Sequence, residues 1–420
     1  MRIAFKYSVC MFAALAASGL VAADWPMAAP ASPAPVANFA SPNPGMTPGP
    51  AHPAQPAPPM LLASEAVEGP AEFWTELEYL LWWMKPVCQK KPLLNTGSES
   101  DAVPGAAGQP NTRPILGSSK YEMPAASGAR ATIGFWLPEY QEFGWEASGF
   151  WLPEVRNTHA FSSFAGSPAT YLPYTDQNNI SQALPFTIPG QVEGGIVATG
   201  SSELWGAETN ALWRVAEQCG ICTRRVVLLA GFRYVNLRDE ILINQAQIAR
   251  SDASFALGGA QYVTQNHFFG GQVGARVELN YGDWSIEATG KFAPGETKLI
   301  SDIAGSALYA GQQVLPGSVP GPLLAFPSNI GRSETWALSF AQELSLKLRY
   351  RLSQNVQATL GYDLLYLNRI VCPGDQMPLL VNVTQIPQLG PVAGKVEPKP
   401  LLFHTDYFAQ GLTAGLEFRY

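Results

Sequence analysis

Residues 406–420 close the chain and read DYFAQGLTAGLEFRY. Counting back in steps of two from Tyr420 gives an apolar face with aromatic residues at its ends, whereas the residues in between are charged, small or polar. A period of two over this length predicts a strand that can cross a bilayer. An apolar outward face, a polar inward face and aromatic residues at the membrane surfaces are typical of a transmembrane β-barrel. The stretch therefore predicts the last strand of an outer-membrane barrel.

The first residues predict export. Residues 1–23 have a basic start at Arg2 and Lys6, an apolar run and small residues up to Ala23. This pattern indicates a secretory signal peptide that is cleaved near Ala23. A membrane anchor is the alternative, but the apolar run is short for one. Residues 24–70 are rich in proline and alanine, which predicts a disordered linker in front of a barrel over residues 71–420.

Composition narrows the function classes. Charged residues make up 14% of the chain and aromatic residues 11%, and the formal net charge is −7. An acidic chain of this kind has no bias toward nucleic acid. After the predicted signal peptide no stretch is apolar for as long as a membrane-spanning helix requires.

Ten segments alternate with strand periodicity, which predicts an all-β, antiparallel barrel of about ten strands. In residues 334–350, for example, one face runs from Trp336 to Tyr350 through residues that are apolar except for Gln342, and the other carries serine, glutamate, lysine and arginine. Twelve strands is the alternative, because residues 240–249 could either extend a hairpin above the membrane or add a pair. The segments are 72–84, 129–138, 142–152, 203–214, 225–237, 267–280, 283–293, 334–350, 355–368 and 405–420.

The connections between these segments alternate in length. Outer-membrane barrels have short periplasmic turns and long outer loops. Such an alternation requires ten strands with both ends on the periplasmic side. The long connections are roughly 85–128, 153–202, 238–266, 294–333 and 369–404, and the short ones lie near 138–141, 215–224, 281–282 and 352–354.

Several motifs together resemble one family. They are EYLLWWMKP at 78–86, FGWEASGFWLP at 143–153, LWGAETN at 204–210, LLAGFRYVNLRDE at 228–240, GGQVGARVELNYGDWSIEATGK at 270–291, PGDQ at 373–376 and AQGLTAGLEFRY at 409–420. The chain resembles the β-barrel porin-7 family of planctomycete bacteria from about residue 72 onward. The resemblance implies an outer-membrane barrel that contacts membrane lipid and the barrel assembly machinery, with Phe418 and Tyr420 as the assembly signal. It supplies no transport substrate, catalytic residue or oligomeric state.

Placing the polar faces inward fills the predicted lumen with charge of both signs. A barrel of about eight strands has an interior just filled by side chains, and ten is near that limit. Opposite charges in so narrow a lumen should pair and block it. The predicted lumen residues are Glu76, Glu78, Arg130, Glu142, Glu146, Glu208, Arg214, Arg233, Arg276, Glu278, Glu287, Lys291, Glu343, Lys347, Arg349, Asp363, Glu417 and Arg419.

Two functions remain open from the sequence. One is a structural or surface protein with a plugged lumen, and the other is a narrow, porin-like channel for small solutes. No serine or cysteine nucleophile with a positioned base is visible, so an enzyme is not expected. The histidines are too scattered to predict a metal site, and no cofactor motif is present; they are His52, His159, His267 and His404.

Four cysteines follow the signal peptide, and export would place them in an oxidising compartment. Cys219 and Cys222 have the spacing of a redox or metal site, but no second ligand pair is nearby, so a local disulfide is predicted. Cys88 and Cys372 follow the first and ninth strands, with the tenth strand between them. Two strand spacings, roughly 10 Å, exceed the usual Cα separation of a disulfide. Both segments have left the sheet, however, and a Cys88–Cys372 bond is predicted, with two free thiols as the alternative.

Overall fold

The computed structural model of the chain describes residues 73–118, 120–218, 223–251, 253–311, 317–319, 325–378, 380–382, 384, 393–399 and 401–420. They all fall within one compact unit, Val67–Tyr420. The predicted signal peptide, the predicted linker and the pair Cys219 and Cys222 lie outside the described residues. The described residues contain no helix that is long and apolar enough to span a membrane.

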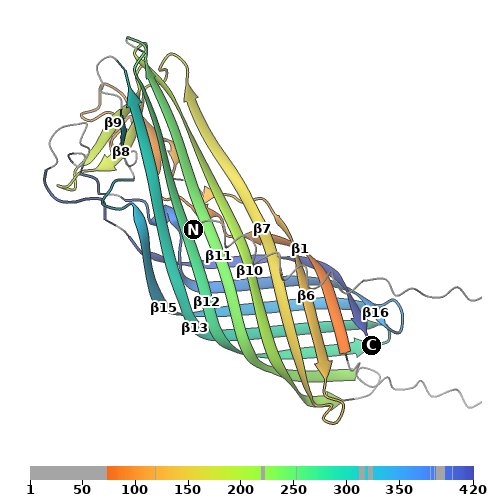
Figure 1. Cartoon of the computed structure of the whole chain (residues 1–420). Helices are drawn as coiled ribbons and strands as arrows, with labels where there is room; N and C mark the ends of the chain where they lie inside the picture. The colour runs from red at the N-terminus through yellow and green to blue at the C-terminus, as the bar shows by residue number, and fades with distance from the viewer. Residues whose placement is uncertain are drawn as a thin grey trace, which may run out of the picture. The chain divides into compact units, whose positions relative to one another are not determined.

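In the described part of the chain, ten long antiparallel strands form a closed ring (Figure 1). Each pairs with the next along the chain, and the first also pairs with the last. The predicted all-β fold and strand number are confirmed. The ring strands are β1 (Phe73–Met84), β6 (Ala126–Trp136), β7 (Phe143–Ser163), β10 (Val192–Gln218), β11 (Thr223–Ala249), β12 (Phe255–Tyr281), β13 (Trp284–Ala310), β15 (Gly331–Arg351), β16 (Val356–Val371) and β17 (His404–Arg419).

The ring has two different ends. One, the turn end, carries the short connections, such as the two-residue turn at Gly282, whose φ of +57° suits glycine. The other, the loop end, carries the longer connections after β1, β7 and β16. Phe73 and Tyr420 exchange backbone hydrogen bonds at the turn end. The first and last strands of the ring are therefore joined at the turn end.

Alternation along each strand sorts the side chains as predicted. On β17, for example, Leu412 and Leu416 are exposed, whereas Thr413 and Glu417 are buried inside the ring. The exposed apolar band is bordered by aromatic side chains that contact each other across neighbouring strands or, for Phe269 and Trp336, across the intervening β13. At the turn end these pairs are Phe73–Tyr420, Phe143–Trp213 and Trp284–Tyr350, and toward the loop end they are Trp205–Tyr234, Tyr234–Phe269 and Phe269–Trp336.

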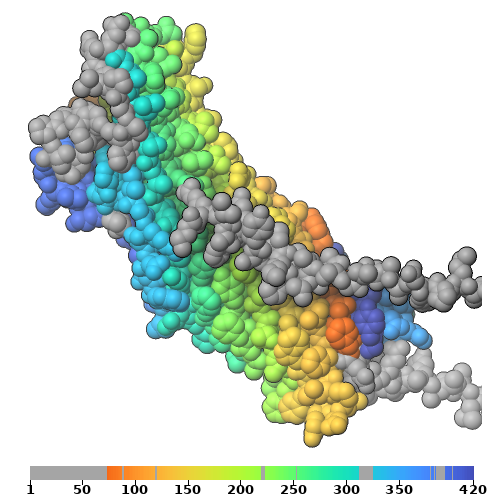
Figure 2. Space-filling view, in the orientation of Figure 1, coloured from red at the N-terminus to blue at the C-terminus, as the bar shows by residue number. Residues whose placement is uncertain are grey.

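The register fixes the width of the ring. Following the paired residues around the ring from Trp284 of β13 leads back to β13 at Glu296, twelve residues further along. With usual strand spacings this stagger tilts the strands by about 40° and gives a backbone radius of about 10 Å. Long side chains from opposite walls of such a ring meet near its axis. Figure 2 shows neighbouring strands packed side by side along the face turned to the viewer.

Several strands are longer than predicted. β10, β11, β12 and β13 continue past the aromatic border toward the loop end (Figure 1). Residues 240–249 extend the β11–β12 hairpin, so this alternative is confirmed and the twelve-strand one is wrong. The long loop predicted over 238–266 is also wrong, since the pairing continues to a short turn after Ala249. The extension is stabilised because inward side chains such as Ile241 and Ile243 are buried in a second core.

The connections at the loop end supply the other side of that core. The first connection contains β2 (Val87–Cys88), β3 (Pro92–Thr96), β4 (Pro114–Gly117) and β5 (Lys120–Tyr121), and the second contains β8 (Thr170–Thr175) and β9 (Ser181–Thr187). β4, β3, β8 and β9 form a small sheet, and a short strand β14 (Gly317–Val319) pairs with β13. We call this loop-end core the head. Its buried side chains include Leu94, Tyr121, Phe186, Ile196, Tyr262 and Met377.

Candidate functional site

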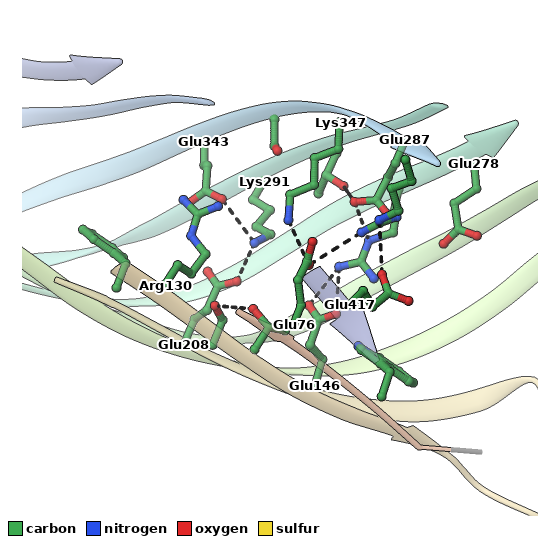
Figure 3. A pocket seen from close by; sticks show the side chains of 18 of the residues that line it. Glu76, Arg130, Glu146, Glu208, Glu278, Glu287, Lys291, Glu343, Lys347 and Glu417 are labelled. Atoms are coloured by element: carbon green, nitrogen blue, oxygen red, sulfur yellow. Dashed lines mark hydrogen bonds and ion pairs between the residues drawn. The ribbon is translucent and has the colours of Figure 1, made fainter. Parts of the chain in front are cut away.

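The interior of the ring near the turn end is a layer of charged side chains (Figure 3). Every one of the ten ring strands contributes at least one of them, and opposite charges are in contact throughout. We call this set the charged layer. Its members are Glu76, Glu78, Arg130, Glu146, Glu208, Arg233, Arg276, Glu278, Glu287, Lys291, Glu343, Lys347, Arg349, Asp363 and Glu417.

Four members of the charged layer form a closed ring of alternating sign. Arg233 contacts both Glu208 and Glu343. Lys291 contacts the same two carboxylates and lies 3.3 Å from Glu343. Each acid therefore has two cationic partners and each base has two anionic ones. All four side chains are less than a tenth exposed, so screening by solvent is weak.

A second group joins β1 to β6, β15 and β16. Lys347 Nζ lies 3.0 Å from Glu76 and 2.8 Å from Glu78. Arg130 lies 3.4 Å from Glu78 and 3.0 Å from Asp363. Glu78 and Asp363 have fully buried side chains. Their negative charges are therefore balanced by Arg130 and Lys347 and not by contact with water.

A third group lies closer to the turn end. Arg349 contacts Glu287 and lies 3.2 Å from Glu417. Arg276 lies 2.8 Å from Glu146 and 3.7 Å from Glu287, which joins β12 to β7 and β13. Arg349 is also 3.7 Å from Glu76, so the third group continues into the second.

These contacts cross the interior. Lys347 on β15 reaches β1, and Arg276 on β12 reaches β7, each three strands away around the ring. A cavity of about 90 Å³ remains in the layer. That volume holds a few water molecules at roughly 30 Å³ each. Buried atoms such as Arg233 Nη1 and Asp363 Oδ1 lack protein partners and would bind such waters.

Above the charged layer, toward the loop end, the interior is apolar. On β1 the inward residues change from Glu76 and Glu78 to Leu80, Trp82 and Met84 within one strand. We call this set the apolar layer. Its buried members are Leu80, Trp82, Met84, Ala126, Leu152, Leu204, Val235, Leu237, Phe268, Ala293, Ala341, Leu365, Leu367, Ile370, Tyr407 and Ala409. The sequence interpretation missed it, although inward parity continues along the same strands.

A smaller apolar cluster lies at the turn end. Trp136, Leu212, Val227 and Leu229 are buried together, with Trp74 packed against them. Arg214 lies 4.4 Å from the centre of the Trp136 ring. The charged layer is thus placed between two apolar clusters.

Most predicted lumen residues point inward, with exceptions near the turn end. Glu142 lies instead in the exposed turn before β7, because the inward alternation begins only with that strand. Arg214 and Arg419 lie at the turn-end margin of the layer. Arg225 was missed, although it has the same parity on β11 as Arg233. It lies 2.9 Å from Glu217 and 3.0 Å from Glu278.

The remaining predicted residues lie away from this layer. Tyr420 is exposed on the outer surface at the turn end, and Phe418 lies on the same face of β17. Cys372 is buried in the head just before a short helical turn η1 (Pro373–Asp375), which contacts β2. Nothing is described for the side chain of Cys88. Its neighbour Lys90 lies 2.8 Å from Asp375, so the two segments run side by side.

The described histidines that were considered as metal ligands lie far apart in the fold. His159 packs against the Tyr121 ring, His267 Nδ1 lies 2.8 Å from the Tyr234 hydroxyl, and His404 is exposed. His52 lies outside the described residues. Across the described ranges, no group of three or more His, Cys, Asp or Glu side chains is placed to hold a metal ion.

Burial changes two ionisable groups in the head. The pKa of Tyr121 is raised well above its usual value because burial disfavours the phenolate, and its hydroxyl donates to Gln89 Oε1 at 2.5 Å. Burial lowers the pKa of Lys91 to about 8, although nearby Asp375 opposes the shift. Lys91 donates to the carbonyl oxygen of Met377. The first connection is therefore attached to the last by polar contacts.

Comparison with known families identifies the fold. The model of the family described as "Putative beta barrel porin-7 (BBP7)" matches residues 74–420. The chain belongs to the β-barrel porin-7 family. The resemblance inferred from its motifs is confirmed, and the chain is an outer-membrane β-barrel. No curated protein sequence matches it.

Solved structures of outer-membrane proteins are distantly similar. The outer membrane protease OmpT of Escherichia coli is 9% identical, with 83% of this chain and 96% of that chain covered and a TM-score of 0.40. The toluene transporter TodX of P. putida is 9% identical over 84% and 91% of the two chains, with a TM-score of 0.20. A FadL homologue of Pseudomonas aeruginosa is 8% identical over 83% and 90%, with a TM-score of 0.20. Similarity this distant transfers neither activity nor substrate to a porin-7 barrel.

Proposed function

We propose that this porin-7 barrel is a structural and surface protein whose lumen is closed to solutes. The observation that carries the proposal is the filling of the interior at successive levels. Charged side chains from all ten ring strands pair across the lumen near the turn end, and the apolar layer lies above them. In an outer membrane the turn end faces the periplasm and the head faces outward.

Energetics favour a closed state. Opening the charged layer would separate buried ion pairs, and an unpaired buried charge costs about 3–5 kcal/mol. Opening the apolar layer would expose side chains such as Leu80 and Leu237. Full burial of one such side chain stabilises a protein by about 1.5–3 kcal/mol. A solute would have to pass both levels. The proposed role is therefore structural, and it depends on the head and not on solute transport.

Solute flux tests this proposal. Proteoliposomes that contain the purified, folded chain should swell in arabinose no faster than protein-free liposomes. A general porin reconstituted in the same way provides the positive control. Swelling that rises with the amount of folded barrel would contradict the closed lumen.

A narrow channel is the second candidate. The cavity within the charged layer favours it, because its lining contains both acids and bases that could bind a small polar solute. Such a channel would also need a path past Trp82 and Leu237, which are fully buried. Uptake of one small zwitterionic solute with no uptake of sugars would support this candidate.

We propose that export and assembly follow the usual route for such barrels, with a signal peptide cleaved near Ala23 and recognition of Phe418 and Tyr420 by the assembly machinery. The exposure of Tyr420 at the end of the closing strand supports this role. Deletion of 418–420 should leave the chain in the periplasm, whereas Tyr420→Phe should assemble normally. Normal membrane yield from the deletion would show that these residues are dispensable.

We also propose a Cys88–Cys372 disulfide in the head. The contact between β2 and η1 and the ion pair of Lys90 with Asp375 support it. Peptide mapping without reductant should recover the two cysteine peptides as one linked species. Complete alkylation of both thiols before reduction would rule the bond out.

A further inference from the structure

The first connection at the loop end contains three buried oxygen atoms with no hydrogen-bond partner. They are Asn95 Oδ1, Asp101 Oδ2 and Thr112 Oγ1. Asn95 is 2% exposed and Asp101 is 7% exposed. Buried polar atoms in folded proteins are almost always hydrogen-bonded, so three such oxygens in one short loop require an explanation.

The loop is held together by its own polar contacts. Asn95 Nδ2 donates to the carbonyl oxygen of Gly105 at 2.9 Å, which turns the amide into the loop. Asp101 Oδ1 accepts hydrogen bonds from the backbone N–H and the side-chain amide of Asn111. The backbone N–H of Thr96 donates to the carbonyl oxygen of Arg113 at 2.8 Å, which ties the two ends of the loop together.

The environment of Asp101 is electrostatically incomplete. Both hydrogen bonds to its carboxylate come from the neutral Asn111. In the described part of the chain, no lysine or arginine nitrogen lies within ion-pair distance of it. Hydrogen bonds, a cationic partner or a metal ion can offset the lost hydration of a buried carboxylate, and here only hydrogen bonds to one oxygen do so among the described residues. The second oxygen of this carboxylate is the one that has no partner.

We propose that residues 95–112 bind a calcium ion through Asp101 Oδ2, Asn95 Oδ1 and Thr112 Oγ1. Carboxylate, amide and hydroxyl oxygens are hard ligands, which suit calcium, whereas zinc takes mainly nitrogen and sulfur. Calcium accepts six to eight oxygens in flexible geometry, so backbone carbonyls and water complete the shell. With one carboxylate the site is weak, in the range of about 10⁻⁴–10⁻³ M that is typical of extracellular modules.

Calorimetry tests the site on the full chain. The folded, EGTA-treated protein in detergent is titrated with calcium chloride. Wild-type protein should show one saturable event in that concentration range, and Asp101→Asn should weaken it at least about tenfold. Glu99→Gln is the matched control, because Glu99 is exposed in the same loop and should leave the event unchanged. Thr112→Val, which removes only the hydroxyl oxygen, should weaken binding by a smaller factor.

Two results would overturn the proposal. Wild-type protein could show no saturable calcium binding at millimolar concentration, in which case water satisfies the oxygens. Asp101→Asn, with heat-modifiable gel migration like that of wild type, could bind as tightly as wild type.

Discussion

The charged layer and the apolar layer fill the same lumen by opposite physical means. The charged layer places acids and bases from strands three positions apart around the ring in contact, as in the pairs Lys347–Glu76 and Arg276–Glu146. The apolar layer removes side chains such as Trp82 and Leu237 from water altogether. The first depends on matched geometry, because a charge that loses its partner is costly. The second depends on volume, because cavities and inserted charges are costly.

The difference shows how a barrel sequence should be interpreted. Where the lumen is charged, strands alternate clearly, as in residues 343–350. Where it is apolar, both faces of a strand are apolar and the alternation disappears, as in YLLWWM at residues 79–84. A continuous apolar run is typical of strands buried on both faces. In a barrel strand it indicates an apolar lumen at that level.

The largest effect should come from a charge placed in the apolar layer. Leu237→Lys inserts an ammonium group among apolar side chains, two residues along the inward face of β11 from the buried Asp239, and should still destabilise the barrel by about 5 kcal/mol or more. Guanidinium unfolding in detergent, followed by tryptophan fluorescence, measures it. Leu237→Met conserves volume and should cost less than about 1.5 kcal/mol. Equal stability of the two variants would remove the distinction between the layers.

The next effect comes from removing one charge from the charged layer. Arg349→Met leaves Glu287 and Glu417 without their shared partner and should cost about 3–5 kcal/mol. Adding Glu287→Gln should recover at least about 1 kcal/mol, since the two side chains are coupled. Arg156→Met is the control, because Arg156 pairs with Glu154 on the surface and should contribute less than about 1 kcal/mol. An equal loss of stability in Arg349→Met and Arg156→Met would show that the buried ion pairs contribute no more to stability than a surface ion pair.

A smaller effect is expected where the ring meets the head. Asn266 donates to the carbonyl oxygen of Val371 at 3.0 Å and accepts from its N–H at 2.7 Å. Asn266→Ala leaves both backbone groups buried without partners and should cost about 2–3 kcal/mol. Hydrogen exchange at Val371 should accelerate, whereas Gln265→Ala on the opposite face should leave it unchanged. Unaltered exchange in Asn266→Ala would show that this amide does not join the two regions.

Much of the fold followed from the sequence, because period and connection length are local signals. The ten strands, the outward apolar band and the inward parity of Glu208 or Arg349 are examples. The head could not be predicted from the sequence, because Ile241 and Ile243 are buried by loops that lie far away in the chain. The partners of each charge also could not be predicted. They depend on the stagger of the ring, which brings Arg130 to Asp363 across 233 positions of the chain.

Single-channel recording in planar bilayers tests the closed lumen most directly. Purified barrel that shows heat-modifiable migration should insert and give no conductance steps. A variant with small residues in both layers, such as Trp82→Ala with Lys347→Ala and Glu76→Ala, should give steps if it folds, and confirms that insertion can be detected. Regular steps from the unmodified barrel, in proportion to folded protein, would contradict the account.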